Sequence, residues 1–592
     1  MTKKYIKLFI VEPFKASKLF TIYSLICCIL GGILPVLQVI VVSNFINSAL
    51  ASYKSNNINN EIYAWMALLV FFVAYDWING RIIGLLKIRA EVDLLKKYRL
   101  GLVEKASRLE YKYIENSEAW DLISRVLSST ESKVLNNFNA VLGLVSLIIS
   151  LIGIIVVVAN YVWWSALLIF LFCIPLFVFS IKGGKASYNA QRGASMYERK
   201  CGYLHEILVN RENVEERNVF SYEKAIDEKY DETNIKAFWI IIKTNLIWVF
   251  KTRLSGGLTS AAALIIILTL IQPTLNHMLS AGMFISLVNS IFQLSSSMGY
   301  GLSSSMDSIV QGMEYVKDIN TFMEMEEIEE ANCEPDNSIS IEEIIFDNVS
   351  FKYPGTEKYV IKNMSFALEK GKHYAFVGMN GAGKTTAIKL LTGLYPYYEG
   401  NIFINGKELR KYKQREIKGM FSVVYQDFAK YYLTLKDNIL MGNVNEMNHI
   451  KKKIEKLISL LDLDLCVERL ENGLDTNLGK LEKNSVDLSG GQWQRVAMAR
   501  GLLNPADVRI LDEPTAALDP VMESKMYKLF KDLVEDKLTI FISHRLGSIN
   551  IADEILVFEK GRISERGTFE EIMNLKGTFY EMYDKQRGWY HE

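Results

Sequence analysis

A glycine-rich stretch that ends in Lys and Thr indicates a site for phosphate groups. Residues 378–385 read Gly-Met-Asn-Gly-Ala-Gly-Lys-Thr, which fits the spacing G-x-x-x-x-G-K-[ST] between a predicted strand and a predicted helix. Glycines let backbone N–H groups approach phosphate oxygens, and the helix start adds positive potential. The Lys384 ammonium then reaches the β- and γ-phosphates, and the Thr385 hydroxyl ligates Mg²⁺. The residues expected to bind the nucleotide phosphates are Gly378, Met379, Asn380, Gly381, Ala382, Gly383, Lys384, Thr385 and Thr386.

Two adjacent carboxylates, Asp512 and Glu513, follow the mostly apolar stretch 508–511, which predicts a strand. In that position Asp512 can hold the shell of a Mg²⁺ ion, and Glu513 can polarise the attacking water. The alternative is an acidic strand end without a catalytic role. Arg509 interrupts the apolar strand, so its side chain must reach an edge or a polar partner.

The predicted strands and helix around the glycine-rich stretch and the two carboxylates lie in the second half of a chain of 592 residues. Hydrophobic residues make up 50% of the chain and charged residues 23%, which is too apolar for a disordered protein. Lys+Arg and Asp+Glu both number 67, so no basic excess favours a nucleic acid as partner. The six cysteines are scattered without the spacing of a metal site, and we interpret them as thiols.

The first half of the chain carries apolar segments that predict about six membrane-spanning helices. At about 1.5 Å per residue, roughly 20 apolar residues cross the hydrocarbon core of a bilayer. The segments are 19–42, 62–86, 140–159, 162–181, 258–271 with the residues that lead into it, and 281–303.

The connections between these segments predict their orientation. Segments 87–138 and 182–243 are long, rich in Lys and Arg, and helical in periodicity, so we expect both to extend the helices into the cytoplasm. An even number of spans then places both ends of the chain inside. The domains are therefore expected to be a transmembrane domain at 1–310, an acidic linker at 311–340 and an α/β domain at 341–592, in which 344–353 and 373–377 are strands and 385–394 is a helix.

Residues 488–492, Leu-Ser-Gly-Gly-Gln, resemble the signature of ATP-binding cassette (ABC) proteins, and they stand between the glycine-rich stretch and the two carboxylates as in that family. The resemblance implies that Tyr353 stacks on adenine, that Gln426 contacts the metal and the attacking water, that Asp519 lies in the D-loop, and that His544 is the switch histidine. Taken singly, Tyr353, Gln426 and His544 could also be a core tyrosine, a surface amide and a buried histidine. The catalytic set implied is Glu513, His544, Gln426 and Lys384, the metal set is Thr385, Gln426 and Asp512, and the signature set that contacts a partner's ATP is Leu488, Ser489, Gly490, Gly491 and Gln492.

About six spans followed by one nucleotide-binding domain resemble an ABC exporter half-transporter, a translocase that hydrolyses ATP. The expected fold is an all-α six-helix membrane domain with long cytosolic extensions, followed by an α/β P-loop ATPase domain. Within the family the signature faces the P-loop of a second cassette, which implies a homodimer, or a heterodimer with a related chain. The resemblance also implies coupling helices near 116–124 and 210–220, and ATP binding that switches the cavity from inward- to outward-facing.

Polar residues on the last span form a candidate pathway for cargo. Ser286, Asn289, Gln293, Ser296 and Tyr300 recur every three or four residues and share one helical face. Hydrogen bonding between helices is the alternative explanation for such a face.

Three stretches, 425–434, 478–487 and 492–495, resemble bacteriocin and lanthipeptide exporters. A peptide is therefore the preferred cargo, a drug or lipid is the alternative, and an ATP-gated channel or a regulatory subunit comes last. Fewer than about twenty residues precede the first span, so the N-terminal cysteine-peptidase domain of some peptide exporters is not expected. The predicted location is a bacterial cytoplasmic membrane, with lipid, cargo and a second copy of the chain as partners.

Overall fold

The computed structural model describes residues 2–56, 60–161, 163–297, 301–444, 450–514, 525–526, 536–543 and 546–588. The chain forms two compact units, and each is built from two separate stretches. The helical unit consists of Met1–Ser107 and Trp120–Met325, and the α/β unit consists of Arg108–Ala119 and Glu326–Glu592.

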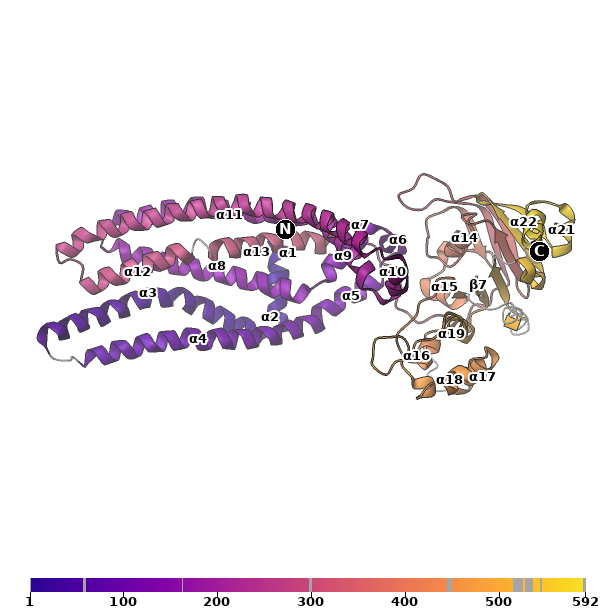
Figure 1. Ribbon diagram of the computed structural model, residues 1–592, viewed down its shortest axis with the longest axis horizontal. Coiled ribbons are helices and arrows are strands. Elements are labelled where there is room, and N and C mark those ends of the chain that lie inside the picture. Colours follow the sequence, from indigo (N-terminus) through magenta and orange to yellow (C-terminus); the bar gives the residue numbers. More distant parts are fainter. Residues whose placement is uncertain are drawn as a thin grey trace. The chain divides into compact units, whose positions relative to one another are not determined.

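Long helices that lie side by side make up the helical unit (Figure 1). The long helices are α3 (Lys18–Ser55), α4 (Glu61–Leu94), α8 (Thr130–Ala159), α9 (Trp163–Val209), α11 (Glu223–Leu275), α12 (Ala281–Ser297) and α13 (Ser303–Glu324). Shorter helices are α1 (Thr2–Ile6), α2 (Glu12–Ala16), α5 (Leu100–Ser107), α7 (Ser117–Leu127) and α10 (Val214–Phe220), with the π-helices η1 (Lys7–Val11) and η2 (Leu95–Arg99) and the 3-10 helix η3 (Arg211–Asn213). The first residues of α7 belong to the α/β unit.

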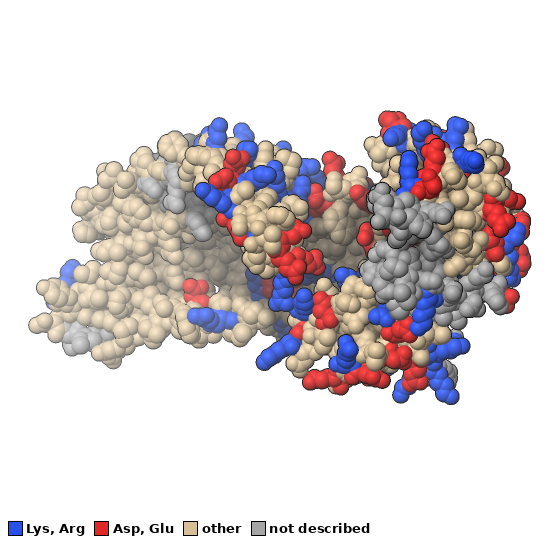
Figure 2. Space-filling model, turned by 45° about the vertical axis from the view of Figure 1, so that its right-hand side comes forward, with Lys and Arg blue, Asp and Glu red and all other residues tan. Residues whose placement is uncertain are grey.

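Three helices of the described residues are long and apolar enough to cross a membrane: Lys18–Ser55, Glu61–Ser107 and Thr130–Ala159. Shorter apolar stretches occupy Ala263–Leu275 and Ala281–Gln293. At about 1.5 Å per residue, the 38 residues of α3 reach about 57 Å, nearly twice the hydrocarbon thickness. In the view of Figure 2, much of the surface of the helical unit shows no charged residues (neither blue nor red), as a lipid-facing surface requires.

Glycines set the close packing of α3 against α8. A Cβ atom added at Gly32 would lie 2.7 Å from the Ile149 Cβ, and one added at Gly153 would lie 2.4 Å from the Val36 Cγ2. Only glycine therefore allows the two backbones to approach this closely, as small residues do between membrane helices.

Helices and strands alternate in the α/β unit. Its elements are α6 (Tyr111–Glu115), β1 (Glu343–Phe351), β2 (Ile361–Glu369), β3 (His373–Gly378), α14 (Lys384–Leu391), β4 (Glu399–Ile404), β5 (Lys407–Glu408), η5 (Leu409–Lys411), α15 (Gln414–Met420), β6 (Phe421–Val424), α16 (Leu435–Leu440), α17 (Lys451–Leu460), α18 (Asp464–Glu468), η7 (Gly473–Asp475), α19 (Gly490–Leu503), β7 (Val508–Asp512), β8 (Leu538–Ile542), η8 (Leu546–Ile551), β9 (Glu554–Glu559), β10 (Arg562–Gly567), α21 (Phe569–Leu575) and α22 (Thr578–Gly588). The strands form one sheet in the order β2-β1-β4-β5 and another in the order β10-β9-β3-β8-β7-β6.

The larger sheet brings two predicted site segments to one edge. β3 and β7 both run parallel to β8, and Phe376 of β3 and Asp512 of β7 are each paired with Ile542. The carboxyl ends of these strands therefore flank the same point, which is where parallel sheets bind ligands. The helix that follows β3 ends at Leu391, earlier than the predicted 394, because Gly393 turns the backbone to a φ of 72°.

Arg509 finds its polar partner at the end of a helix. Its guanidinium lies in the buried strand β7 and donates to the carbonyl oxygens of Gly501 at 2.6 Å and Asn504 at 2.8 Å. These carbonyls belong to the last turn and the C-cap of α19, where the helix has no donors of its own. A cation inside an otherwise apolar strand thus stabilises the helix that starts in the signature stretch.

Candidate functional site

The P-loop connects β3 to α14, as the glycine spacing predicts. A Cβ atom at Gly378 would lie 2.2 Å from the Phe558 carbonyl oxygen, so no side chain fits there. Gly383 is the N-cap of α14 and has a φ of 108°, which an L side chain rarely adopts. These two glycines let the loop turn tightly before the helix, so its N–H groups can be directed at an anion.

A cavity of about 550 Å³ gathers the predicted nucleotide site. Its lining includes the P-loop from Asn380 to Thr386 together with Gln426, Asp512 and Glu513. The lining residues come from five separate segments of the chain, and the strand order brings them to one edge of the sheet. The cavity has both the size and the polar groups for a nucleoside phosphate.

Lys384 is the buried cation of this cavity. Its ammonium donates to the carbonyl oxygens of Gly378 at 2.7 Å and Met379 at 3.2 Å. Burial lowers the pKa of Lys384, while the nearby carboxylates of Glu513 and Asp512 act in the opposite direction. A negatively charged phosphate would offset the same burial, which makes this ammonium well suited to bind one.

Asp512 and Thr385 provide the oxygen atoms for a cation. The Thr385 Oγ1 lies 3.4 Å from the Asp512 Oδ2. Burial raises the pKa of Asp512 to about 6, and the adjacent Glu513 carboxylate adds to the shift. A divalent cation between these oxygens would favour the ionised carboxylate, and hydroxyl, carboxylate and phosphate oxygens are the ligands that Mg²⁺ prefers. The residues therefore fit a magnesium ion.

Glu513 is held by two glutamines. The Gln426 Nε2 donates to its Oε2 at 2.7 Å, and the Gln494 Nε2 donates to its backbone oxygen at 3.2 Å. Glu513 also has a φ of 47°, an uncommon conformation for a non-glycine residue that is often found at functional sites. Gln494 is not among the site residues that the sequence predicts. Its signal in the sequence is its place two residues after the signature, and the fold shows that its side chain is buried.

Tyr353 lies beside the P-loop helix. Its hydroxyl is 3.0 Å from the Thr386 Oγ1, and its ring makes an edge contact with Tyr395 at 5.6 Å between centroids. The ring is thus fixed next to the phosphate-binding helix, and its contact with adenine stays a prediction.

The signature residues begin α19. Ser489 is the N-cap, and it exchanges hydrogen bonds with Gln492 in a capping box, at 2.8 Å and 3.3 Å. Trp493 is buried and donates from Nε1 to the Asp487 Oδ1 at 3.0 Å, which ties the helix to the preceding loop. The signature therefore lies at a helix N-terminus. Three other candidates, His544, Asp519 and Tyr300, lie outside the described residues.

The short helix α6 belongs to the α/β unit, although in the chain it lies between the two stretches of the helical unit. In α6, the Glu115 carboxylate accepts a hydrogen bond from Lys389 at 2.9 Å and another from the Tyr395 hydroxyl. The Tyr111 ring makes an edge contact with the Tyr395 ring. The coupling helix implied near 116–124 falls on α7, whose first residues also belong to the α/β unit, and its coupling role stays a prediction. The other predicted coupling stretch, 210–220, forms η3 and α10.

The predicted pathway residues on α12 differ in exposure. Ser286 is buried, and its hydroxyl donates to the Met283 carbonyl oxygen of its own helix at 3.0 Å. Asn289, Gln293 and Ser296 are exposed on the chain. Gln293 lines a pocket in the helical unit together with residues of α3 and α8.

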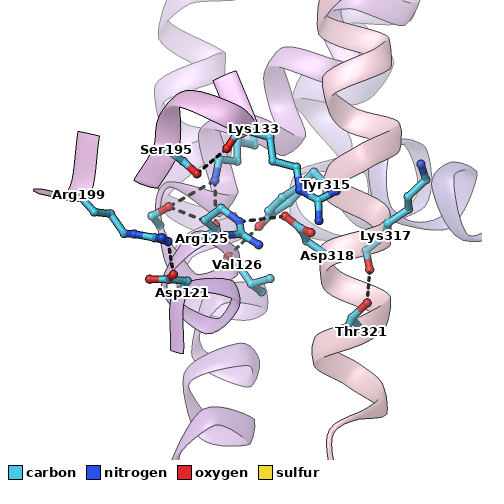
Figure 3. A network of polar contacts seen from close by, with 12 residues as sticks. Asp121, Arg125, Val126, Lys133, Ser195, Arg199, Tyr315, Lys317, Asp318 and Thr321 are labelled. Carbon is cyan, nitrogen blue, oxygen red and sulfur yellow. Dashed lines mark hydrogen bonds and ion pairs between the residues drawn. The ribbon is translucent and has the colours of Figure 1, made fainter. Parts of the chain in front are cut away.

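Polar contacts fasten α7 to two long helices (Figure 3). Arg125 pairs with Asp318 of α13 at 3.3 Å, and Asp121 pairs with Arg199 of α9. The Lys133 ammonium lies over the Tyr315 ring at 4.7 Å, and the Tyr315 hydroxyl donates to the Val126 carbonyl oxygen at 2.8 Å. These contacts connect α7 to both α9 and α13.

Comparisons with known proteins match both parts of the chain. Residues 361–516 match the family model of the ABC transporter, and residues 21–298 match that of the ABC transporter transmembrane region. The solved structure of a bacterial Atm1-family ABC exporter with ATP bound superposes with a TM-score of 0.75 and 20% identity, and the match covers 95% of this chain and 98% of that one.

Relatives of similar length share this layout. The subtilin transport ATP-binding protein SpaT of Bacillus subtilis is 29% identical over 94% of this chain and 90% of its own length. The nisin transport ATP-binding protein NisT of Lactococcus lactis subsp. lactis is 26% identical over 96% and 94%. An ATP-dependent lipid A-core flippase of Sodalis glossinidius (strain morsitans) is 26% identical over 90% of each chain. The chain therefore belongs to the ATP-binding cassette transporters, as an exporter whose helical membrane domain precedes the ATPase that drives transport.

Proposed function

We propose that this exporter moves a peptide out of the cytoplasm across a bacterial cytoplasmic membrane. The observation that carries the proposal is the likeness to the subtilin and nisin transport proteins over 94% and 96% of the chain, membrane domain included. The stretches 425–434, 478–487 and 492–495, which resemble bacteriocin and lanthipeptide exporters, support the same cargo class.

The proposed hydrolytic step uses the residues gathered in the P-loop cavity. Lys384 binds the β- and γ-phosphates, and Tyr353 holds the adenine. Thr385, Asp512 and Gln426 would hold Mg²⁺, which neutralises charge on the phosphates when it is bound. Glu513 polarises the attacking water, and the hydrogen bond from Gln426 fixes the orientation of its carboxylate. His544 and Asp519 complete the set that the family resemblance implies.

We propose that the working unit is a homodimer. The signature at the N-terminus of α19 offers Ser489 and backbone N–H groups to a γ-phosphate, and in this family that phosphate is held by a second cassette. The candidate residues of both half-sites are all present in one chain, so two copies related by a two-fold axis would form two equivalent sites. Binding of two ATP molecules would then draw the cassettes together.

The movement would reach the membrane through the segment that contains α6 and α7. The side chains of α6 hold the ATPase domain, and α7, which follows directly in the chain, is fastened to α9 and α13. Closure of the cassettes would shift these long helices and switch the cavity between its inward- and outward-facing states.

A lipid is the second candidate cargo. The specific observation in its favour is the 26% identity to the lipid A-core flippase over 90% of both chains. The subtilin transport protein is 29% identical, and the nisin transport protein and the flippase are each 26% identical, so the experiment offers both classes of cargo.

The experiment is ATP-dependent uptake into inside-out vesicles that contain the full-length protein. The vesicles are offered leader-bearing peptides, lipophilic cations and labelled lipids, with Glu513→Gln as the background. Selective peptide uptake is the expected result. Uptake of dyes or lipids without peptide would replace the proposal with the multidrug or flippase function.

A further inference from the structure

We propose that a pocket in the membrane domain, formed by α3, α8 and α12, binds an uncharged hydrogen-bonding group of the cargo, such as a backbone amide or a hydroxyl-bearing side chain of a peptide. This inference rests on the proposed export function and names the part of the cargo that this site selects. The pocket has a volume of about 200 Å³. One water molecule needs roughly 15 Å³ on the same measure, so the pocket has room for a small side chain.

Hydroxyl and amide groups line the pocket from two helices. Ser146 and Ser150 are one turn apart on α8, and Ser290, Gln293 and Ser297 follow one face of α12. The Ser290 hydroxyl donates to the Ser286 carbonyl oxygen at 2.9 Å, which leaves its own oxygen as an acceptor. The pocket therefore offers both donors and acceptors.

The third helix contributes a backbone acceptor. Pro35 lies inside α3 and has no N–H group, so the Gly31 carbonyl four residues earlier lacks its helical donor. Both Gly31 and Pro35 line the pocket. A side chain at Gly31 would crowd Ser146, because an added Cβ would lie 3.2 Å from the Ser146 Oγ. The glycine thus keeps the backbone open to a bound group.

The depth of these residues determines which way the pocket can face. Gly31 and Pro35 lie near the middle of the apolar segment 19–42, and Ser146 and Ser150 lie within 140–159. Lipid tails offer no hydrogen bonds, and each polar group left without one at this depth costs free energy. The pocket is therefore expected to open onto the aqueous pathway.

The charge of the lining restricts the ligand. None of the residues that the structure describes around the pocket is ionisable. A phosphate headgroup at this depth needs Arg or Lys to offset its desolvation, whereas an amide or a hydroxyl is satisfied by serine and glutamine. The pocket therefore favours a peptide group over the phosphate of an anionic lipid.

The first test measures peptide uptake by inside-out vesicles that carry pocket variants. Ser150→Ala and Gln293→Leu each remove a hydrogen-bonding group, and each is expected to raise the half-saturating peptide concentration about fivefold. The matched control is Thr269→Val on α11, whose hydroxyl donates to the Ile266 carbonyl oxygen at 2.7 Å. Basal ATPase activity of each variant checks that it is folded.

The second test needs no transport. The substitution Ser150→Cys is made in a protein without native cysteines. The variant is treated either with hydroxyethyl methanethiosulfonate, which is neutral, or with sulfonatoethyl methanethiosulfonate, which is anionic. The neutral reagent is expected to react at least about tenfold faster, and a Ser- and Leu-containing peptide without charged groups is expected to slow it. Met278→Cys, at a residue that is 75% exposed, is expected to react with both reagents at similar rates.

The outcomes separate this inference from the proposed function. If the wild type takes up peptide and the pocket variants match the control, the pocket assignment is wrong and the export function stands. If the wild type takes up no peptide, the export proposal fails. The labelling rates then show by themselves whether the pocket binds an uncharged group. Equal reaction with the anionic reagent, or no slowing by peptide, overturns the pocket assignment.

Discussion

The Glu115 carboxylate lies 2.9 Å from the Lys389 ammonium, although 274 residues separate them in the chain. Lys389 belongs to α14, the helix that starts in the P-loop, and its ammonium also lies over the rings of Tyr111 and Tyr353. Burial acts to raise the pKa of Glu115, but hydrogen bonds from Tyr395 and Lys389 outweigh it and hold the pKa below its usual value. The pair thus links α6 to the nucleotide-binding helix.

Breaking this pair is expected to uncouple ATP hydrolysis from transport. In Lys389→Met the basal ATPase activity should stay within about twofold, because Lys389 lies outside the set of residues expected to bind and hydrolyse ATP. Stimulation of the ATPase by cargo should fall at least about fivefold. The exchange Glu115→Lys with Lys389→Glu restores the pair and should recover much of the stimulation. Full stimulation in Lys389→Met would contradict the link.

Replacing Glu513 by Gln is expected to stop turnover while ATP binding continues. The amide keeps the size of the side chain but cannot polarise water, so phosphate release should fall by at least about 100-fold. Nucleotide binding, measured with a fluorescent ATP analogue, should remain within about threefold of the wild type. Normal ATPase activity in this variant would show that another group activates the water.

The affinity for MgATP should depend on pH through Asp512. Folding raises the pKa of Asp512 to about 6. Above that pH the ionised carboxylate destabilises the nucleotide-free fold. Below that pH a proton competes with the cation for the carboxylate. Between about pH 7.5 and pH 5.5 the affinity should fall about fourfold more in the wild type than in Asp512→Asn. Isothermal titration of both proteins measures the difference. Parallel pH profiles would exclude Asp512 as the titrating ligand.

Removing the buried cation of β7 should destabilise the ATPase domain. Arg509→Leu leaves the carbonyl oxygens of Gly501 and Asn504 without a donor inside the fold. We expect a loss of about 2 kcal/mol or more in the free energy of unfolding, measured by urea denaturation. Lys418→Leu, which removes a surface cation from α15, is the control and should change stability by less than about 1 kcal/mol.

The nucleotide site could be predicted because its information is local. The glycine spacing fixes the turn before Lys384, and an apolar strand places Asp512 at its end, so each segment carries its own geometry. The sequence predicts that Arg509 needs an edge or a polar partner, but it does not identify that partner. That partner is the end of α19, and only the folded sheet brings the two together.

Contacts between distant segments could not be predicted in the same way. α6 has only five residues, too few for a helical periodicity, and its partners Lys389 and Tyr395 follow almost 300 residues later. The polar face of α12 is ambiguous for a related reason. Steps of three or four from Gln293 lead either to Asn289 and Ser296 or to Ser290 and Ser297, and the neighbouring helices decide which pair lines the pocket.

The α/β unit is built from two stretches, and this has a consequence for synthesis of the protein. The ribosome makes Glu115 280 residues before its partner Tyr395, which corresponds to about 14–56 s at roughly 5–20 residues per second. During that interval the α6 side chains have no ATPase surface to cover them. A chain that stops before residue 395 leaves Tyr111 without the ring it packs against. The full set of α6 contacts therefore forms only after Tyr395 has been made.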